Sequence, residues 1–194
     1  MILCLTGMMG CGKSSVGRAL AERTGLPFRD LDEAVEARTG RRIPEIFRTD
    51  GEAAFRKLEL EALEDFLARG EDAVLALGGG TVTTPRCAGL VREQTFCIYL
   101  RTSVDTLCGR LSAGGEAAAR PLLAVCDGPS AGLRPGGAPA DTGRSALRSR
   151  LEGLLAAREA LYVAASRAAV DTDGRSPAAL AEQILLLSPL RRDC

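Results

Sequence analysis

A glycine-rich segment near the N-terminus places the strongest limit on how this chain folds. Residues 7–14 are GMMGCGKS and match the pattern G-x-x-x-x-G-K-[ST]. The apolar run 2–6 precedes this segment, and a helical pattern at 14–24 follows it. A strand, a glycine loop and a helix in this order direct successive backbone N–H groups and the positive end of the helix dipole at one anion. The segment therefore predicts a nucleotide-phosphate site rather than an ordinary glycine-rich turn.

The polar side chains of this loop suit the phosphates and metal ion of a nucleotide. Lys13 would reach the β- and γ-phosphate oxygens, and the hydroxyl of Ser14 would bind Mg²⁺. Cys11 lies in the same loop, and two interpretations of it remain open. A neighbouring lysine and a helix N-terminus favour a reactive thiolate, whereas a small residue whose side chain points away from phosphate needs no such chemistry.

Short apolar runs alternate with helical patterns along the rest of the chain. Continuous apolar runs are typical of strands that helices cover on both faces, and their alternation with helices is typical of a parallel sheet. We therefore expect an α/β fold with five strands, right-handed crossovers and a ligand site at the carboxyl ends of the strands. The expected strands are residues 2–6, 28–30, 73–77, 95–100 and 168–171, and the expected helices are 14–24, 31–39, 52–69, 104–111, 144–165 and 177–187.

The charge and composition exclude several functions. The 194 residues include 25 basic and 25 acidic side chains, so the chain carries no net charge. It therefore lacks the excess of basic residues expected of a protein that binds nucleic acid or an anionic membrane. The chain also contains no histidine, which rules out Ser-His-Asp hydrolysis, Cys-His catalysis and zinc sites that need imidazole. Catalysis must therefore depend on Asp, Glu, Lys, Arg or Cys.

Length and cysteine usage indicate one cytoplasmic domain. A chain of 194 residues can bury about 70% of its unfolded surface, so we expect a single domain over 1–194. Its seven cysteines are widely spaced and include no C-x-x-C pair, as expected of reduced thiols. The N-terminus lacks the basic region of a signal peptide, and no apolar run reaches the ~20 residues of a membrane span. We therefore expect a cytoplasmic protein without membrane or nucleic-acid partners.

Further motifs follow or flank the expected strands, where the ligand site of such a fold lies. They are F-x-D-x-D at 28–32, D-G-E-x-x-F-R-x-x-E at 50–59 and a triple glycine at 78–80. With R-T-G-R-x-I-x-x-I-F at 38–47, R-P-L-L at 120–123, R-x-x-L-Y at 158–162 and V-D-T at 170–172, they cover nearly the whole chain. With these motifs in this order, the chain resembles the shikimate kinase family, part of the nucleoside-monophosphate-kinase-like P-loop group.

The resemblance implies a three-layer P-loop kinase fold, in which helices flank a central five-stranded parallel sheet and a mobile lid closes over the site. It also implies that the γ-phosphoryl group of ATP is transferred to the 3-hydroxyl of shikimate, with Mg²⁺ as cofactor and with shikimate 3-phosphate and ADP as products. The expected partners are these two small molecules, and the expected state is a monomer. The lid would span about residues 112–143 and contain a Gly/Pro-rich insertion at 126–141, which has little apolar surface to bury.

By this resemblance, the ATP side of the site includes the P-loop and three arginines. Arg120 matches the lid arginine that stabilises the charge of the transferring phosphoryl group. Arg110 and Arg175 match residues that flank the adenine. Lys13, Asp32 and Arg120 are the expected catalytic residues. The expected ATP-binding residues are Gly10, Gly12, Lys13, Ser14, Ser15, Gly17, Arg110, Arg120 and Arg175.

The acceptor side includes two carboxylates, two arginines and three glycines. By the resemblance, Asp30 would hold Mg²⁺ through water, together with Ser14, while Asp32 would bind the ring hydroxyls and accept a proton from the attacking one. We expect these two carboxylates to point to opposite sides, one toward the metal and one toward the acceptor, although either could instead cap the following helix. The expected substrate-binding residues are Asp32, Arg56, Gly78, Gly79, Gly80 and Arg158.

Arg56 and Arg158 match the arginines that grip the carboxylate of shikimate in this family. The planar guanidinium binds a carboxylate through two parallel hydrogen bonds, which lysine does less selectively. Glu59 follows Arg56 by one turn of the expected helix and would orient it as an i, i+3 partner. The glycines at 78–80 would bring backbone N–H groups close to the substrate, where a side chain would collide.

One departure from the family affects the lid, and two alternative functions remain open. Arg120 and Arg158 are 38 positions apart, which is longer than expected of the family, and the Gly/Pro-rich insertion fills this gap. Another small-molecule kinase, such as a gluconate kinase, is disfavoured by the pairing of Arg56 with Arg158, because it lacks a carboxylate clamp of this motif type. A regulatory domain that binds nucleotide without catalysis is disfavoured by the joint presence of the residues expected to act in catalysis, which are Lys13, Ser14, Asp30, Asp32 and Arg120.

Overall fold

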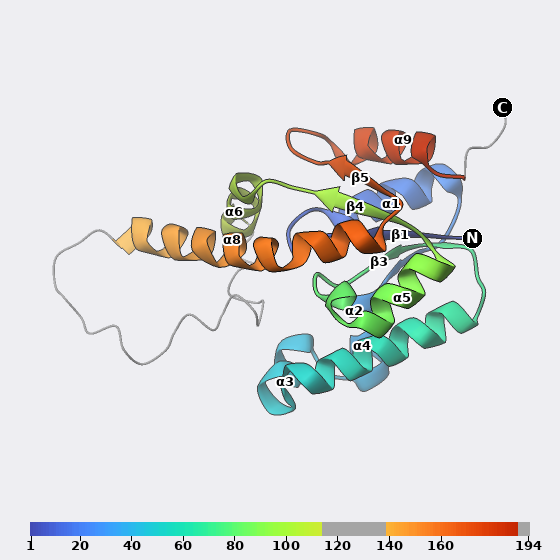
Figure 1. Ribbon diagram of the computed structural model, residues 1–194, viewed down its shortest axis with the longest axis horizontal. Helices are drawn as coiled ribbons and strands as arrows, with labels where there is room; N and C mark the ends of the chain where they lie inside the picture. Colours follow the sequence, from blue (N-terminus) through green and yellow to red (C-terminus); the bar gives the residue numbers. More distant parts are fainter. Residues whose placement is uncertain (114–138, 190–194) are drawn as a thin grey trace.

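The computed structural model describes residues 1–113 and 139–189. Arg120 and residues 126–138 of the expected insertion lie outside these described residues. Figure 1 shows strands side by side between two layers of helices, with the long helix α8, Pro139–Ala165, extending beyond one end of the sheet.

Five parallel strands form one sheet in the order β2-β3-β1-β4-β5. Every pair of neighbours is parallel; Cys4 of β1, for example, lies opposite Leu75 of β3 and Cys97 of β4. The five-stranded parallel sheet expected from the sequence is thereby confirmed. The strands are β1 Ile2–Thr6, β2 Phe28–Asp30, β3 Ala73–Ala76, β4 Phe96–Arg101 and β5 Ala168–Asp171.

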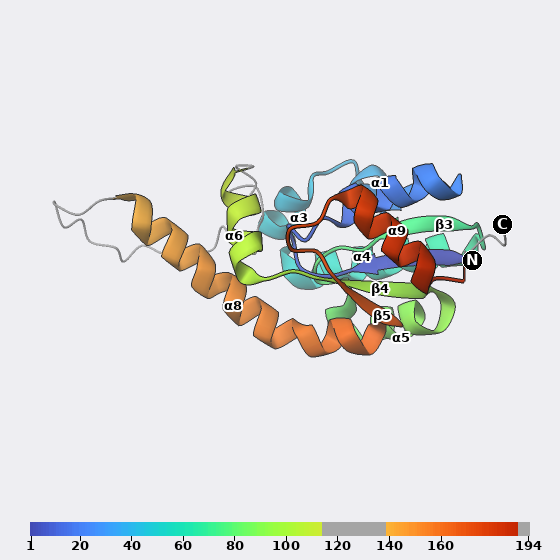
Figure 2. The same ribbon diagram turned by 90° about the horizontal axis from the view of Figure 1, so that it is seen from above.

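Helices cover both faces of the sheet, so the three-layer architecture is also confirmed. Helices α1 and α9 pack against each other on one face, and α4, α5 and α8 lie on the other (Figure 1 and Figure 2). In a right-handed crossover, the direction of the step to the next strand decides which face the connecting helix covers. The chain steps one way from β1 to β2 and the opposite way in its later connections, so α1 lies on one face and α4, α5 and α8 lie on the other. The helices are α1 Lys13–Thr24, α2 Leu31–Thr39, α3 Ile43–Thr49, α4 Gly51–Ala68, α5 Pro85–Gln94, α6 Val104–Ala113, α8, and α9 Pro177–Leu187.

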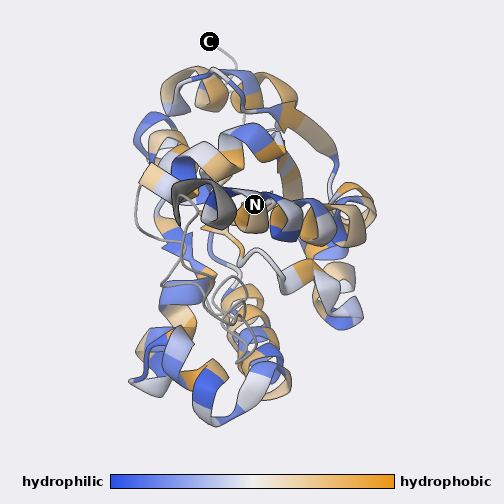
Figure 3. Cartoon of the chain, turned by 90° about the vertical axis from the view of Figure 1, so that its left-hand side faces the viewer, coloured by the Kyte–Doolittle hydropathy of each residue, from blue (hydrophilic) through white to orange (hydrophobic). Residues whose placement is uncertain are grey.

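The core lies between the sheet and these helices. Strands β1 and β3 are buried along their whole length, so neither shows the alternation of a half-exposed strand. Orange hydrophobic and blue hydrophilic positions alternate along the helices in Figure 3, as expected of helices with one face on the core. Among the described residues, no helix combines the length and the apolar character that a membrane span needs.

The structure contains two helices and a short 3-10 turn that the sequence analysis does not predict. Helix α3 has seven residues, of which only Ile46 is buried. Helix α5 begins at Pro85, directly after the turn η1, Thr81–Thr83. Helix α3 gives too few turns for a clear 3.6-residue periodicity, whereas α5 has ten residues with Cys87, Leu90 and Val91 buried at helical spacing, a signal that the sequence analysis missed.

Helix α8 begins earlier than the sequence predicts. The helical pattern starts at residue 144, whereas the helix begins at Pro139. Residues 139–141, which the sequence analysis includes in the Gly/Pro-rich insertion, form the first turn of α8. Proline is tolerated there, since the first helical N–H groups lack intrahelical acceptors and the fixed φ of proline suits a helix.

Gly17 of α1 lies against the ring of Phe28 in β2. A Cβ at position 17 would be 2.3 Å from Cε2 of Phe28, whereas a Cβ at Gly153 in α8 would meet nothing within 4 Å. We expect Gly17→Ala to lower the free energy of unfolding by about 1–3 kcal/mol, because the added methyl group overpacks this contact. Gly153→Ala, the matched control, should raise it by about 0.5–1 kcal/mol through higher helix propensity. Urea unfolding measures both, and a stabilised Gly17→Ala variant would contradict the packing explanation.

Candidate active site

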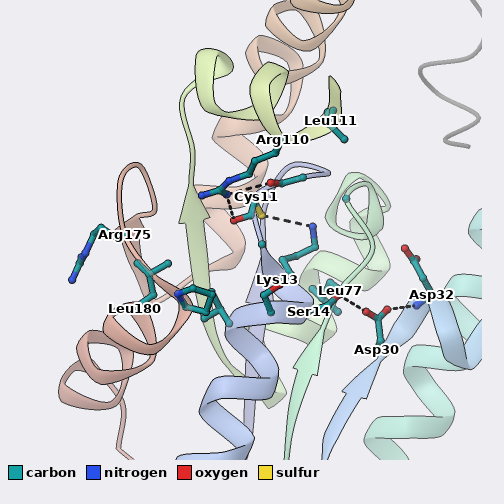
Figure 4. A pocket seen from close by; sticks show the side chains of 16 residues that line it. Cys11, Lys13, Ser14, Asp30, Asp32, Leu77, Arg110, Leu111, Arg175 and Leu180 are labelled. Carbon is teal, nitrogen blue, oxygen red and sulfur yellow. Dashed lines mark hydrogen bonds between the residues drawn. The ribbon is translucent and has the colours of Figure 1, made fainter. Parts of the chain in front are cut away.

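The loops that follow β1, β2 and β3 meet at the carboxyl edge of the sheet. Neighbouring parallel strands end at the same edge, so loops that are distant in the sequence come together there. They form a cleft of about 450 Å³ (Figure 4). The residues that line this cleft are Gly10, Cys11, Gly12, Lys13, Ser14, Ser15, Val16, Asp30, Asp32, Leu77, Gly79, Arg110, Leu111, Arg175, Pro177 and Leu180.

The P-loop, residues 7–14, depends on glycine for its shape. Gly7, Gly10 and Gly12 have φ values of 143°, 79° and 101°, which side chains disfavour. A Cβ at Gly7 would also lie 2.7 Å from the carbonyl oxygen of Leu100 in β4. Gly12 is the N-cap of α1 and lines the cleft, so the positive end of that helix lies at the cleft.

Lys13 crosses the P-loop and donates to its carbonyl groups. Its Nζ lies 2.9 Å from the carbonyl oxygen of Gly7 and 3.0 Å from that of Met8. The thiol of Cys11 is nearby, with Sγ 3.8 Å from Nζ, but only 1% of Cys11 is exposed. This burial favours the interpretation of Cys11 as a small packed residue over that of a reactive thiolate.

Asp30 has two partners, one for each oxygen of its carboxylate. The hydroxyl of Ser14 donates to Oδ2 at 2.8 Å. The backbone N–H of Asp32 donates to Oδ1 at 3.0 Å, so Asp30 caps helix α2. The capping alternative is therefore confirmed for Asp30, and capping leaves its second oxygen beside Ser14.

The Ser14 hydroxyl and the Asp30 carboxylate fit a magnesium ion. Both are oxygen ligands beside the phosphate loop, and Mg²⁺ is usually held by one or two protein oxygens together with waters and substrate phosphates. Within residues 1–113 and 139–189, no group of three or more Cys, Asp or Glu side chains is arranged to hold a metal without such help. The donor set thus suits a metal that arrives with a nucleotide.

Asp32 lies against the glycine turn, which we define as Gly78, Gly79 and Gly80. A Cβ at Gly78 would be 2.7 Å from Oδ1 of Asp32. Figure 4 shows the Asp32 side chain pointing away from Ser14. The two carboxylates diverge because Asp30 ends β2 whereas Asp32 lies in the first turn of α2, since residues two apart on a continuous strand would share a face. Asp32 also lines the cleft together with residues of the P-loop. Its carboxylate therefore lies between the P-loop and the glycine turn.

Two carboxylates hold the guanidinium of Arg56 over the glycine turn. Nη1 donates to Oε2 of Glu59 at 2.8 Å, which confirms the expected contact, and Nη2 donates to Oε1 of Glu52 at 3.0 Å. A Cβ at Gly80 would lie 2.2 Å from Nη2, so glycine leaves the room that the guanidinium occupies. Burial opposes the charge of Arg56, but Glu59 and Glu52 outweigh it and hold the pKa of Arg56 above its ordinary value.

Glu59 is a fully buried carboxylate with a partner that the sequence analysis did not identify. None of its surface is exposed. Besides binding Arg56, Glu59 accepts a hydrogen bond from the hydroxyl of Thr81. Two donors offset the cost of removing this charge from water. Thr81 directly follows the glycine turn, and that position is the signal that could have identified it.

Two side chains of α8 bind the glycine turn from the side opposite α4. Arg158 is 8% exposed, and its Nη1 donates to the carbonyl oxygen of Gly79 at 3.4 Å. One turn later, the hydroxyl of the buried Tyr162 donates to the same oxygen at 2.5 Å. Arg56 and Arg158 thus lie against neighbouring glycines. The sequence analysis placed Tyr162 in a motif but assigned it no partner.

Arginine and apolar side chains line the part of the cleft near α6 and α9. Arg110 of α6 donates to the carbonyl oxygen of Cys11 at 3.0 Å. Figure 4 shows Arg175 beside Leu180, and Pro177 of α9 also lines the cleft. A planar guanidinium and apolar side chains suit the face of an aromatic base. The structure thus brings both expected adenine-flanking arginines to the cleft.

Only some of the other expected nucleotide-binding residues line the cleft. Gly10, Gly12 and Ser15 line the cleft. Gly17 does not line it and instead packs against Phe28. Arg120 lies outside the described residues.

A chain with this strand order and this cleft is a P-loop kinase, an enzyme class that moves a phosphoryl group from a nucleotide to a second substrate. Comparison with known proteins narrows the class. The family model of shikimate kinase matches residues 9–188. The chain belongs to the shikimate kinase family.

Individual relatives agree with the family model. The chain is 47% identical to the shikimate kinase of Bordetella avium over 123 residues, which are 63% of this chain and 57% of that protein. It is 42% identical to the shikimate kinase of Streptomyces coelicolor over 176 residues, which are 91% of this chain and 88% of that protein. The solved structure of shikimate kinase from Acinetobacter baumannii in complex with shikimate is similar with a TM-score of 0.77 and 32% identity, covering 96% of this chain and 91% of that one.

Glu59 and Glu52 bind the same guanidinium from a buried and an exposed position. The side chain of Glu59 is 0% exposed, and that of Glu52 is 50% exposed. We expect Glu59→Gln to lower the free energy of unfolding by about 1–3 kcal/mol, because Arg56 keeps its charge in a buried place without its main partner. Glu52→Gln should change it by less than about 1 kcal/mol, as is usual for exposed ion pairs. Urea unfolding compares the two, and equal losses would contradict this explanation.

Proposed function

We propose that this protein catalyses transfer of the γ-phosphoryl group of ATP to the 3-hydroxyl of shikimate, which yields shikimate 3-phosphate and ADP. The observation that carries the proposal is the meeting of a phosphate loop and an arginine pair at one cleft. Arg56 and Arg158 lie against Gly80 and Gly79, and Gly79 lines the cleft that contains Lys13. The related kinase from Acinetobacter baumannii was solved in complex with shikimate.

The nucleotide would lie along the P-loop with its base near α9. Lys13 would exchange its carbonyl partners for β- and γ-phosphate oxygens, and the N–H groups at Gly10 and Gly12 would bind the same phosphates. Arg110 and Arg175 would flank the adenine. These contacts strengthen as negative charge develops on the transferring group, so they would contribute to kcat as well as to binding.

Magnesium is part of the proposal. Ser14 would hold the ion directly and Asp30 through water, and the hydrogen bond between these two side chains already places their oxygens together. The bound ion would neutralise charge on the phosphate oxygens. Asp30 is kept in place by its cap on α2, so the ligand position does not depend on the ion.

The acceptor would lie at the glycine turn. Arg56 and Arg158 would bind the carboxylate of shikimate, and Asp32 would bind its ring hydroxyls and accept the proton of the attacking one. Phosphoryl transfer has a loose transition state with charge spread over several oxygens, so positioning and electrostatics should contribute more than the proton transfer. Arg120 would add charge stabilisation from the lid, beyond the described residues.

Two rival functions make different predictions. Gluconate and shikimate both carry a carboxylate that the Arg56–Arg158 pair could bind, and the match to the shikimate kinase family favours shikimate. A regulatory domain without catalysis would have no use for Asp32 beside that turn and beside the cleft. Release of ADP separates all three possibilities.

The test is a coupled assay of ADP release with MgATP and either shikimate, gluconate or no acceptor. We expect release only with shikimate, and one phosphate added to shikimate in the mass spectrum of the product. Removal of the metal with EDTA should abolish the release, and Mg²⁺ should restore it. Faster release with gluconate, or binding of ATP without release under any condition, would contradict the proposal.

Lys13 and Lys57 are the only lysines of the chain, and they form a natural pair for mutation. We expect Lys13→Ala to lower kcat/KM by about a hundredfold or more, because a transition-state phosphate contact is lost. Lys57→Ala removes an exposed charge on α4 and should leave kcat/KM within about twofold. Steady-state kinetics measures both, with thermal melting to show that each variant folds. If kcat/KM of Lys13→Ala stayed within threefold of the parent value, the assignment of the P-loop to nucleotide binding would be wrong.

Arg56→Ala tests which ligand the arginine binds. A charge-assisted bidentate contact contributes roughly 1.5–3 kcal/mol, so we expect KM for shikimate to rise about ten- to a hundredfold while KM for ATP changes little. Arg86→Ala, which removes an exposed arginine on α5, is the control and should leave both values unchanged. A rise in KM for ATP alone would assign Arg56 to the nucleotide.

A monomeric, single-domain protein of the cytoplasm completes the proposal. Five cysteines of the described residues, Cys4, Cys11, Cys87, Cys97 and Cys108, are free and buried. Free thiols are typical of a reducing compartment. Size-exclusion chromatography with light scattering would test the monomer.

A further inference from the structure

Tyr162 is a buried polar side chain that none of the steps above uses. None of its surface is exposed, and its ring stacks on that of Tyr99 in β4, with centroids 5.2 Å apart and planes at 25°. This stacking leaves the ring little freedom and fixes the place of its hydroxyl. Burial is the main cause that raises the pKa of Tyr162 above its ordinary value, so the phenol stays protonated and acts as a donor.

The hydroxyl of Tyr162 lies between the P-loop and the glycine turn. Its oxygen is 2.5 Å from the carbonyl oxygen of Gly79 and 3.4 Å from Sδ of Met8. A phenol has one hydrogen to donate, and a carbonyl oxygen is a stronger acceptor than a thioether sulfur. Tyr162 therefore donates to Gly79 and only contacts the P-loop residue Met8.

The hydrogen bond to Gly79 sets the direction of the next N–H group. The C=O of Gly79 and the N–H of Gly80 belong to one planar peptide, and because this peptide is trans they point in opposite directions. A carbonyl held toward α8 therefore turns the Gly80 N–H away from α8. Among the described residues, this N–H donates to no protein group. It thus lies free at the glycine against which Arg56 packs.

Tyr162 also affects Arg158, which shares the same carbonyl oxygen. The contact from Nη1 of Arg158 is long, at 3.4 Å, beside the 2.5 Å contact from Tyr162. The guanidinium also hydrogen-bonds the hydroxyl of Tyr162, so this hydroxyl and the carbonyl of Gly79 together hold Arg158 at the glycine turn. Without the phenol hydroxyl, Arg158 would lose one partner and keep only its long contact with Gly79.

We propose that Tyr162 is a positioning residue for the acceptor: it orients the Gly79–Gly80 peptide and helps to hold Arg158 at the glycine turn, so that both bind the acceptor substrate. The proposal rests on the proposed function, since that function places shikimate at the glycine turn. The effect falls on the acceptor rather than on ATP, because the one hydrogen of the phenol is donated to the carbonyl of Gly79 and not to the thioether of Met8.

Tyr162→Phe removes the hydroxyl and keeps the stacked ring. Tyr99→Phe is the matched control, because Tyr99 is 1% exposed, belongs to the same stack and donates to neither loop. We expect Tyr162→Phe to raise KM and the dissociation constant for shikimate about three- to tenfold, as for loss of one hydrogen bond, with KM for ATP within about twofold. Tyr99→Phe should leave all three values within about twofold. Steady-state kinetics and calorimetric titration with shikimate measure them.

Three results would overturn the role of Tyr162. They are an unchanged KM for shikimate in Tyr162→Phe, an equal rise of KM for ATP, or the same changes in Tyr99→Phe, the last two of which indicate a general loss of packing. The parent protein separates this outcome from failure of the proposed function. A parent that releases no ADP with shikimate overturns both, whereas an active parent with an unaffected Tyr162→Phe variant overturns the role of Tyr162 alone.

Discussion

The parallel direction of the five strands is the constraint on which the rest of the structure depends. Because β1, β2 and β3 all end at one edge, the P-loop, the Asp30–Asp32 segment and the glycine turn meet there, although they are far apart in the sequence. An antiparallel neighbour would carry its loop to the opposite edge. Helices α4 and α8 return over the same face of the sheet, and this return brings Arg56 and Arg158 to the turn from two sides.

The charged groups of the site are held by the protein itself. Lys13 donates to loop carbonyls, Arg56 binds the buried Glu59, and Asp30 accepts from Ser14 and from the backbone. Groups that are already oriented lose little free energy to reorganisation when charge develops in a reaction. The buried carboxylate of Glu59 matters most here, because its charge keeps the guanidinium of Arg56 over the glycine turn in a place where burial alone would disfavour it.

Elements with a strong local signal could be predicted from the sequence. The sequence analysis located all five strands, and continuous apolar runs identified β1, β3 and β4 among them. Gly25 and Gly40 mark the ends of α1 and α2, where both have a left-handed φ. Helix α3 could not be predicted, since its seven residues are too few for a clear pattern, whereas α5 has an apolar face of Cys87, Leu90 and Val91 that the sequence analysis missed. The start of α8 was placed too late because proline, usually a helix breaker, here occupies the first turn.

By itself, the sequence determined the chemical groups of this protein and the backbone shapes that depend on one residue, such as the glycine positions of the P-loop and the Arg56–Glu59 pair one turn apart. These signals act over a few residues, so a linear pattern contains them. Only the tertiary structure decided that Thr81 binds Glu59 from 22 positions away and that Tyr162 binds Gly79 from 83 positions away. Such contacts depend on how α4 and α8 pack on the sheet, which is set by the burial of many side chains together and by no single motif.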